Sequence, residues 1–256
     1  MNLIEKMFNK NTLTYIANAG VMINIKDKKI IIDGILDKGP YRGPEDDFVE
    51  KLVLGKEPYH NIDTIFFTHS HRDHIDPEVL NELLKRNRHV RVICPTAATK
   101  LISSQRNYNE VLSPQIMTVA MKNHTRLEIS LGDISFSAHR LVHDGVHHST
   151  LENIAYSIYT GGVSITVLGD AAPVVSDYEK CDIPTKSDIL LCPANYAGQK
   201  SGREIISSLA PKHLALCHIG CDEKELHRIS TLCEKYKKDL PKKVSILTTP
   251  GEVIKL

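Results

Sequence analysis

Apolar stretches separated by short polar turns open the chain. Residues 13–17, 21–25 and 29–33 are rich in aliphatic and β-branched side chains, a composition typical of β-strands. Residues 18–20 and 26–28 lie between them and consist of Asn, Asp, Gly, Ala and Lys, several of which favour turns. Turns this short join antiparallel neighbours. We therefore expect an antiparallel meander of three strands.

The pattern then changes to one that predicts a parallel crossover. Residues 62–67 are β-branched and aromatic enough for a buried strand, and residues 90–94 form a second apolar strand. Between them, residues 77–88 carry apolar side chains at helical spacing after an Asp76-Pro77 start. A strand, helix and strand in succession indicate parallel pairing. The preceding segment 36–61 is predicted to be an insertion, either a lid over a binding site or a surface excursion.

The rest of the chain continues this alternation, without internal repeats or low-complexity tracts. Residues 154–159 and 163–168 are expected to form two strands joined by a Gly-Gly hairpin. The other strands and helices expected are strands around 117–119, 127–129, 134–136, 188–193, 211–218 and 244–247, and helices at 96–104, from about 203, and at 223–236. We predict one α/β domain spanning residues 1–256.

Four potential metal ligands follow the strand at 62–67. They are His69, His71, Asp73 and His74, and the strand-to-helix turn that holds them directs them toward one point. Imidazole nitrogen and carboxylate oxygen suit borderline divalent ions. A solvated loop is the ordinary alternative, and Ser70 with a histidine could imitate part of a nucleophilic triad. A triad needs one base rather than three crowded imidazoles, so a metal site is favoured.

The pattern His69-x-His71-x-Asp73-His74 after a strand resembles the signature of the metallo-β-lactamase superfamily. The resemblance implies a four-layer αβ/βα sandwich and three further ligands. These would be His143 after the strand at 134–136, Asp170 in a Gly-Asp pair after an apolar strand, and His218 at the end of a later strand. His139, His147 and His148 remain alternatives to His143. Asp33, which closes the third strand, would support the metal loop through hydrogen bonds.

The resemblance also implies the composition of a dinuclear site. His69, His71 and His143 would hold one divalent ion and Asp73, His74 and His218 a second, with Asp170 and a hydroxide between them; Asp73 and Asp170 would be the catalytic carboxylates. Zinc is the default for these ligand types, although manganese or iron would also fit. Asn195, Lys200, His147 and His148 are weaker candidates for binding substrate, because Asn195 and Lys200 precede a helix whose N-terminus would favour anions.

The residues that follow the third predicted ligand, His143, indicate the branch of the superfamily. Glyoxalase-like enzymes and the β-lactamases usually carry a His-Thr-x-Gly turn there, whereas this chain has His143-Asp144-Gly145. The chain resembles most the simple metal-dependent hydrolases related to ascorbate-phosphate lactonase, which implies hydrolysis of a small ester, lactone or phosphodiester. Two alternatives stay open: a nuclease or cyclic-nucleotide phosphodiesterase on the same metals, and a mononuclear-iron oxidoreductase of the persulfide dioxygenase type.

Composition narrows the partners. Of 256 residues, 32 are Lys or Arg and 31 are Asp or Glu, so a broad basic surface for nucleic acid or an anionic membrane is not expected. The chain has no long apolar run, and its first residues lack a signal-peptide pattern. We expect a cytoplasmic enzyme with a small-molecule substrate, free buried thiols and no membrane contact; a homo-oligomer stays open.

Overall fold

The computed structural model describes residues 11–36, 42–145, 147–148 and 150–256 of the chain. These residues fold into two compact units. Among the described residues, unit 1 takes 11–36, 43–119 and 249–256, and unit 2 takes Arg42 and residues 120–248. The prediction of one domain stays a prediction, because each unit has its own sheet and its own hydrophobic cluster.

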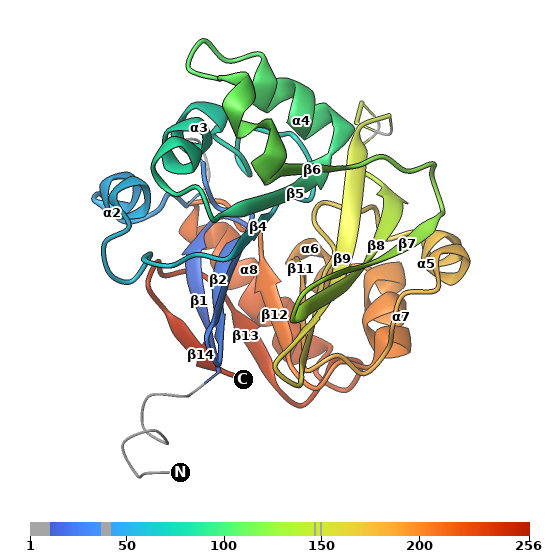
Figure 1. Cartoon of the computed structure of the whole chain (residues 1–256). Coiled ribbons are helices and arrows are strands. Elements are labelled where there is room, and N and C mark those ends of the chain that lie inside the picture. Colours follow the sequence, from blue (N-terminus) through green and yellow to red (C-terminus); the bar gives the residue numbers. More distant parts are fainter. Residues whose placement is uncertain (1–10, 37–41, 146, 149) are drawn as a thin grey trace. The chain divides into compact units, whose positions relative to one another are not determined.

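Unit 1 is built on a mixed seven-stranded sheet in the order β14-β1-β2-β3-β4-β5-β6 (Figure 1). Strands β14, β1, β2 and β3 pair antiparallel, whereas β3, β4, β5 and β6 pair parallel. The strands are β1 (Thr12–Ala17), β2 (Gly20–Ile25), β3 (Lys28–Ile32), β4 (Thr64–Phe66), β5 (Arg91–Pro95), β6 (Ile116–Val119) and β14 (Val253–Lys255). This order confirms both the opening meander and the parallel crossover.

Helices of unit 1 pack on one another and on this sheet, and share one hydrophobic cluster with it. They are α2 (Phe48–Leu54), α3 (Pro77–Arg86), α4 (Thr96–Ser103) and the 3-10 helix η1 (Glu110–Gln115). Asp76 caps α3 by accepting hydrogen bonds from the backbone N–H groups of Glu78 and Val79 at 2.9 and 3.1 Å. The cap fixes the end of the loop that joins β4 to α3.

Helix α2 lies inside the segment expected to be an insertion. Phe48 and Leu52, one helical turn apart, are buried in the cluster of unit 1. These two residues anchor the segment to the core, so it is not a free excursion. Residues 37–41 of the predicted lid lie outside the described residues, and a lid role for the segment stays a prediction.

Unit 2 holds a second mixed seven-stranded sheet, in the order β13-β12-β11-β10-β9-β8-β7. Strands β10, β11, β12 and β13 pair parallel, and β7, β8, β9 and β10 pair antiparallel. The elements are β7 (Arg126–Leu131), β8 (Ile134–Val142), β9 (Glu152–Thr160), β10 (Val163–Val167), α5 (Val175–Cys181), β11 (Ile189–Pro193), α6 (Asn195–Gly198), α7 (Lys200–Leu209), β12 (Leu214–Cys217), α8 (Glu223–Lys235) and β13 (Val244–Ile246). The expected Gly-Gly hairpin is confirmed.

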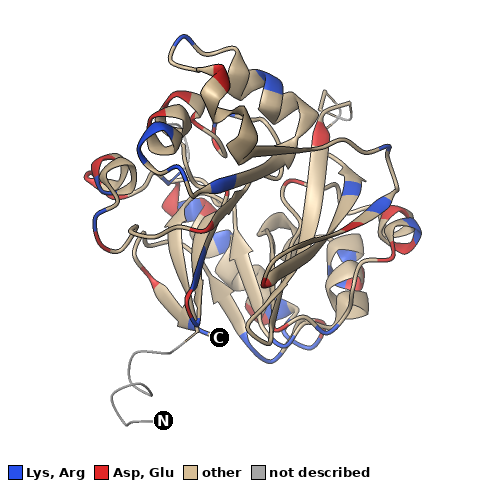
Figure 2. Cartoon of the chain, viewed as in Figure 1, with Lys and Arg blue, Asp and Glu red and all other residues tan. Residues whose placement is uncertain are grey.

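Charges of both signs are interspersed over each unit, although lysines gather in residues 235–243 (Figure 2). No helix in the described ranges combines the length and the apolar character needed to cross a membrane. None of the six cysteines, all within the described residues, forms a disulfide, and four of them are buried.

Candidate metal centre

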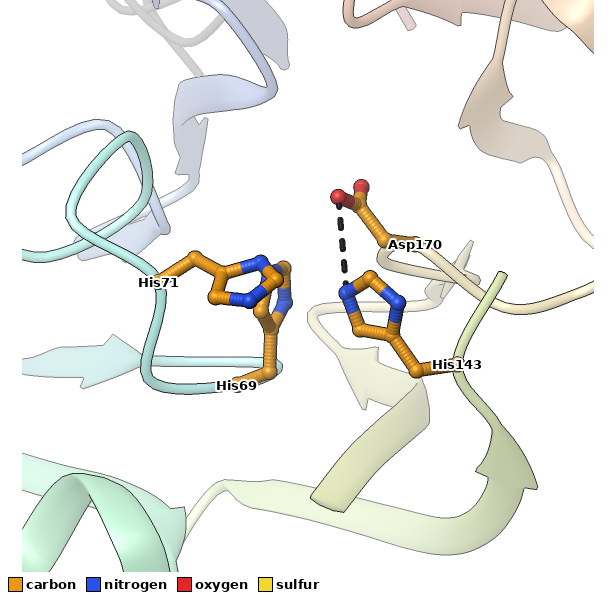
Figure 3. Close-up of side chains that lie close together, drawn as sticks. All are labelled: His69, His71, His143 and Asp170. Atoms are coloured by element: carbon orange, nitrogen blue, oxygen red, sulfur yellow. Dashed lines mark ion pairs between the residues drawn. The ribbon is translucent and has the colours of Figure 1, made fainter. Parts of the chain in front are cut away.

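The ligand cluster of unit 1 occupies the loop between β4 and α3. The imidazole centroids of His69 and His71 lie 4.8 Å apart (Figure 3). Those of His69 and His74 lie 3.9 Å apart. Asp73 Oδ2 lies 3.6 Å from His74 Nε2. His69 and His74 are fully buried, whereas His71 and Asp73 are partly exposed. The loop thus gathers all four predicted ligands of this unit.

Asp33 orients two of these imidazoles. It accepts hydrogen bonds from the backbone N–H and the hydroxyl of Thr68 at 2.9 and 2.8 Å, and from His74 Nδ1 at 3.0 Å. Because the Thr68 hydroxyl donates to Asp33, it accepts from His69 Nδ1, 3.0 Å away. Both rings therefore carry the proton on Nδ1 and present Nε2, the arrangement found where a carboxylate supports a metal-bound histidine.

Close packing of two glycines brings Asp33 into position. A Cβ on Gly20 would lie 2.0 Å from the Cα of Gly34, so no larger residue fits at this point. Gly34 follows Asp33 and has φ +77°, in the region that favours glycine. The contact between Gly20, at the start of β2, and Gly34 thus fixes the end of β3, where Asp33 lies.

Asn18, which the sequence pattern places in a turn, contacts the predicted ligand Asp73. It is fully buried, and its side-chain Nδ2 donates to the backbone O and to Oδ2 of Asp73, both at 3.0 Å. It therefore fixes the orientation of the Asp73 carboxylate. Asn18 follows β1, Asp33 follows β3 and the ligand loop follows β4; since these three strands run in the same direction, all three segments meet at one edge of the sheet.

The cluster of unit 2 is assembled from three loops. His143 follows β8, Asp170 follows β10 and His218 follows β12, and these strands also run in the same direction. Asp170 Oδ2 lies 3.7 Å from His143 Nε2 (Figure 3) and 3.2 Å from His218 Nε2. One carboxylate oxygen thus faces two imidazole nitrogens. The parallel strand directions explain how residues distant in sequence reach the same edge.

Backbone hydrogen bonds and one buried asparagine hold this cluster. His143 Nδ1 donates to the backbone O of Asp144 at 2.6 Å, which leaves Nε2 as the ligand atom, and the N–H of Asp144 donates to the backbone O of Asp170 at 2.8 Å. Asn153 is fully buried. Its Oδ1 accepts from the N–H of Asp170 at 2.9 Å and its Nδ2 donates to the backbone O of Leu168 at 3.0 Å.

Two buried tyrosines support the residue after Asp170. The Tyr196 hydroxyl donates to the backbone O of Ala171 at 2.7 Å, and it accepts from Tyr178 at 2.5 Å. Burial, together with Tyr178, raises the pKa of Tyr196 well above its ordinary value, so the hydroxyl keeps the proton it donates. Neither Asn153 nor these tyrosines lie in a sequence pattern that predicts such a role.

The alternatives to His143 have other surroundings. His139 is buried, its Nδ1 donates to the backbone O of Cys181 at 3.0 Å, and its Nε2 lies 2.8 Å from the Ser137 hydroxyl. Burial lowers the pKa of His139 to about 4. His147 and His148 are exposed, and the His148 ring centroid lies 5.4 Å from that of His143. His143 stays the predicted third ligand.

A pocket of about 320 Å³ lies in unit 2 beside this cluster. Its walls include the three predicted ligands of unit 2, and also Asp144, Gly145, Pro193, Asn195 and Glu225. Of the weaker candidates, Asn195 lines the pocket, and its Nδ2 donates to Asp144 Oδ2 at 3.2 Å. Lys200 lines a different cavity, where it lies 3.6 Å from Glu204.

Residues 28–225 match the family model of the β-lactamase superfamily domain. The match covers more than half of the chain, so this protein belongs to that family. No curated protein is significantly similar to the chain.

Solved structures show the same fold. The metallo-β-lactamase fold protein YhfI from Bacillus subtilis superposes with a TM-score of 0.67 at 17% identity, covering 96% of this chain and 99% of the other. Igni18, a metallo hydrolase from the archaeon Ignicoccus hospitalis, gives 0.64 at 14% identity, with 96% and 98% covered. CmlA, a diiron β-hydroxylase from Streptomyces venezuelae, gives 0.63 at 18% identity, with 97% and 54% covered. The predicted metallo-β-lactamase α/β sandwich is thereby confirmed.

Proposed function

We propose that this protein is a metal-dependent hydrolase whose two ligand clusters together hold a pair of divalent ions. In this proposal His69, His71 and His143 bind the first ion, Asp73, His74 and His218 bind the second, and Asp170 contacts both. A carboxylate has two oxygens and can serve two ions, which an imidazole cannot. The donor set of five imidazoles and two carboxylates fits zinc, and also manganese or iron.

One observation carries the proposal: imidazoles in both units have Nδ1 committed to a hydrogen bond. His69, His74 and His143 use Nδ1 for Thr68, Asp33 and the backbone O of Asp144, respectively, and so present Nε2. Histidines that merely pack or face solvent have no need for such uniform orientation, whereas metal ligands do. Membership of the β-lactamase superfamily and the fold shared with metallo hydrolases support the same conclusion.

The bound ions and the residues around them would have separate roles in hydrolysis. When bound, two divalent ions lower the pKa of a water molecule so that hydroxide is available at neutral pH, and they stabilise negative charge that develops on the substrate. Asp73 and Asp170 would place their carboxylates beside the reacting centre, with Asp73 oriented by Asn18. The 320 Å³ pocket suits a small ester, lactone or phosphodiester, as in hydrolases related to ascorbate-phosphate lactonase.

A substrate panel with a chelation control tests the proposal. The purified zinc-loaded protein is assayed on 4-nitrophenyl acetate, a γ-lactone and bis(4-nitrophenyl) phosphate, before and after removal of metal and after zinc is restored. We expect hydrolysis that disappears on chelation and returns with zinc. Preference for the phosphodiester would favour the phosphodiesterase alternative. A protein that purifies with a single iron, and hydrolyses none of the three, would contradict the proposal in favour of the oxidoreductase.

The matched variants are His71→Ala and, as a control, His89→Ala, because both lie in unit 1 and His89 is exposed outside the ligand loop. Loss of turnover in the first variant and not in the second assigns the reaction to the cluster. Equal rates in both would reject the assignment.

A further inference from the structure

The walls of the 320 Å³ pocket are acidic. Apart from Asp170, two carboxylates line it, those of Asp144 and Glu225, whereas none of its lining residues is Lys or Arg. The only candidate cation for this region from the sequence, Lys200, belongs to another cavity. The carboxylates of this pocket therefore accept hydrogen bonds and attract positive charge.

Hydrogen bonds hold both carboxylates in place. Asp144 Oδ1 accepts from the N–H of Gly145 at 2.8 Å, and Asp144 Oδ2 accepts from Asn195 Nδ2 at 3.2 Å. Glu225 Oε2 accepts from the N–H of Gly220 at 3.0 Å, two residues beyond His218. These partners are neutral backbone or amide groups. Glu225 Oε1 also lies 3.8 Å from a guanidinium nitrogen of Arg228, an exposed side chain that does not line the pocket, so neither carboxylate has a cationic partner among the lining residues.

Asn195 adds a further acceptor. Its Nδ2 is used for Asp144, which leaves the carbonyl Oδ1 as its remaining polar side-chain atom. This oxygen is buried and has no hydrogen-bond partner among the described residues. An amide oxygen in that state is stabilised when a ligand supplies a donor or a positive charge.

We infer that the substrate of this site carries a positively charged ammonium group, which sits between Asp144, Asn195 and Glu225 while the ester or lactone bond faces the metal ligands. The inference rests on the proposed function and narrows its substrate class. It narrows the proposed ester, lactone or phosphodiester to the first two, because a phosphate would meet two carboxylates in the pocket and no Lys or Arg among its lining residues.

Isosteric esters test this inference. Acetylcholine, its neutral isostere 3,3-dimethylbutyl acetate, and a carboxylate-bearing acetate ester of similar length differ in charge and little in shape. For the zinc-loaded full-length protein we expect kcat/KM to fall in that order, with about a fivefold step for each unit of charge, the size of an ion-pair term in a partly solvated site. A preference for the carboxylate ester, or no preference, would overturn the inference.

Variants assign the preference to the pocket. Glu225→Gln and Asp144→Asn keep the size of each side chain and remove its charge, so each is expected to reduce the ratio of acetylcholine to neutral-ester kcat/KM by about fivefold. Glu204→Gln removes an exposed carboxylate on α7 outside the pocket and should leave the ratio unchanged. A ratio unaffected by both pocket variants would overturn the inference.

A binding measurement separates the two hypotheses. Choline and its neutral isostere 3,3-dimethylbutan-1-ol are titrated into the zinc-loaded protein and followed by ligand-detected NMR, which needs no turnover. Tighter binding of choline, lost in the Glu225→Gln/Asp144→Asn double variant, supports the acidic subsite even if no ester is hydrolysed. Hydrolysis of all three esters with equal binding of both alcohols would instead uphold the proposed function and overturn the inference.

Discussion

The two units supply ligands in different ways. In unit 1, one loop of six consecutive residues, from His69 to His74, carries four predicted ligands. In unit 2, three predicted ligands come from three loops, after β8, β10 and β12. The first arrangement is local and depends on side-chain bracing by Asp33 and Asn18. The second depends on strand direction, so its geometry is a property of the whole sheet.

This difference explains the supporting contacts. A short loop can be oriented by side chains, and Asp33 alone accepts three hydrogen bonds from it. Separate loops must also be tied to one another, and the bonds in unit 2 run mostly to backbone: Asn153 and Tyr196 hold residues 168–171, and Asp144 joins the His143 loop to Asp170. We expect a substitution at a supporting residue of unit 2 to disturb a larger part of the structure. A substitution at a supporting residue of unit 1 should affect metal binding more directly.

The largest expected effect is at the ligand that both ions would share. Replacing Asp170 by Asn keeps its size but removes the anionic oxygen that faces His143 and His218. We expect hydrolysis to fall by at least about a thousandfold, with the fold retained in circular dichroism, because the shared charge is lost. The exposed control His227→Ala should keep wild-type activity. An Asp170→Asn protein with wild-type turnover would exclude a bridging role.

The next largest effect concerns the hydrogen bonds by which Asp33 supports the ligand loop of unit 1. Asp33→Asn replaces an acceptor of three hydrogen bonds by an amide that cannot accept on both sides. Loss of such support weakens metal binding by about 10- to 100-fold. Zinc competition with a chromophoric chelator measures the change. An affinity equal to that of wild type would show that the loop holds its geometry without the carboxylate.

A pH effect is specific to unit 2, which buries two histidines outside the proposed ligand set. Burial lowers the pKa of His139 and of His213 from 6.5 to about 4. Since the folded state resists protonation, the unfolded state binds more protons between pH 6.5 and 4, and stability falls as pH falls through that window. Each group costs at most about 1.4 kcal/mol per pH unit.

Urea denaturation at pH 7.5, 6 and 5 measures that slope. His139→Gln removes one of the two groups and should make the decline shallower, whereas the exposed control His227→Gln should leave it unchanged. A slope that is the same in wild type and His139→Gln would show that the buried imidazole does not couple folding to protonation.

The smallest effect concerns the backbone support of Asp170. Tyr196→Phe removes the hydroxyl that donates to the backbone O of Ala171 and leaves the buried ring in place. One neutral hydrogen bond corresponds to about 0.5–1.5 kcal/mol, so zinc affinity should fall by roughly two- to tenfold. Tyr159→Phe, on an exposed ring of the same unit, is the matched control. A larger loss in the control variant would contradict the assigned support.

The two units also differ in how much of the candidate site could be predicted from the sequence. The unit 1 cluster was accessible because its ligands are contiguous and follow a strand that is plainly apolar. Asp170 and His218 lie in ordinary contexts, a Gly-Asp pair and a strand end, so only the family resemblance singled them out. The order of strands and helices could be predicted, because the spacing of hydrophobic residues along the chain differs between the two.

Supporting residues were harder to predict. Asn18 has φ +44° and lies between two strands. An asparagine there is explained by the turn alone, so the sequence gives no sign of its hydrogen bond to Asp73. Asn153 and Tyr196 act through partners distant in sequence, which no local pattern reveals. Helix α2 was missed because glycine and proline dominate the start of its segment, although the spacing of Phe48 and Leu52 is a helical signal.

Metal counting tests the central claim most directly. Elemental analysis of the zinc-reconstituted wild type, of His71→Ala and of His218→Ala measures ions per chain in the whole protein and in one variant from each unit. The account predicts two ions in the wild type and a lower count in both variants, because each cluster contributes ligands to the same pair of ions. A wild type that holds one ion or none, or two variants that keep two, would contradict it.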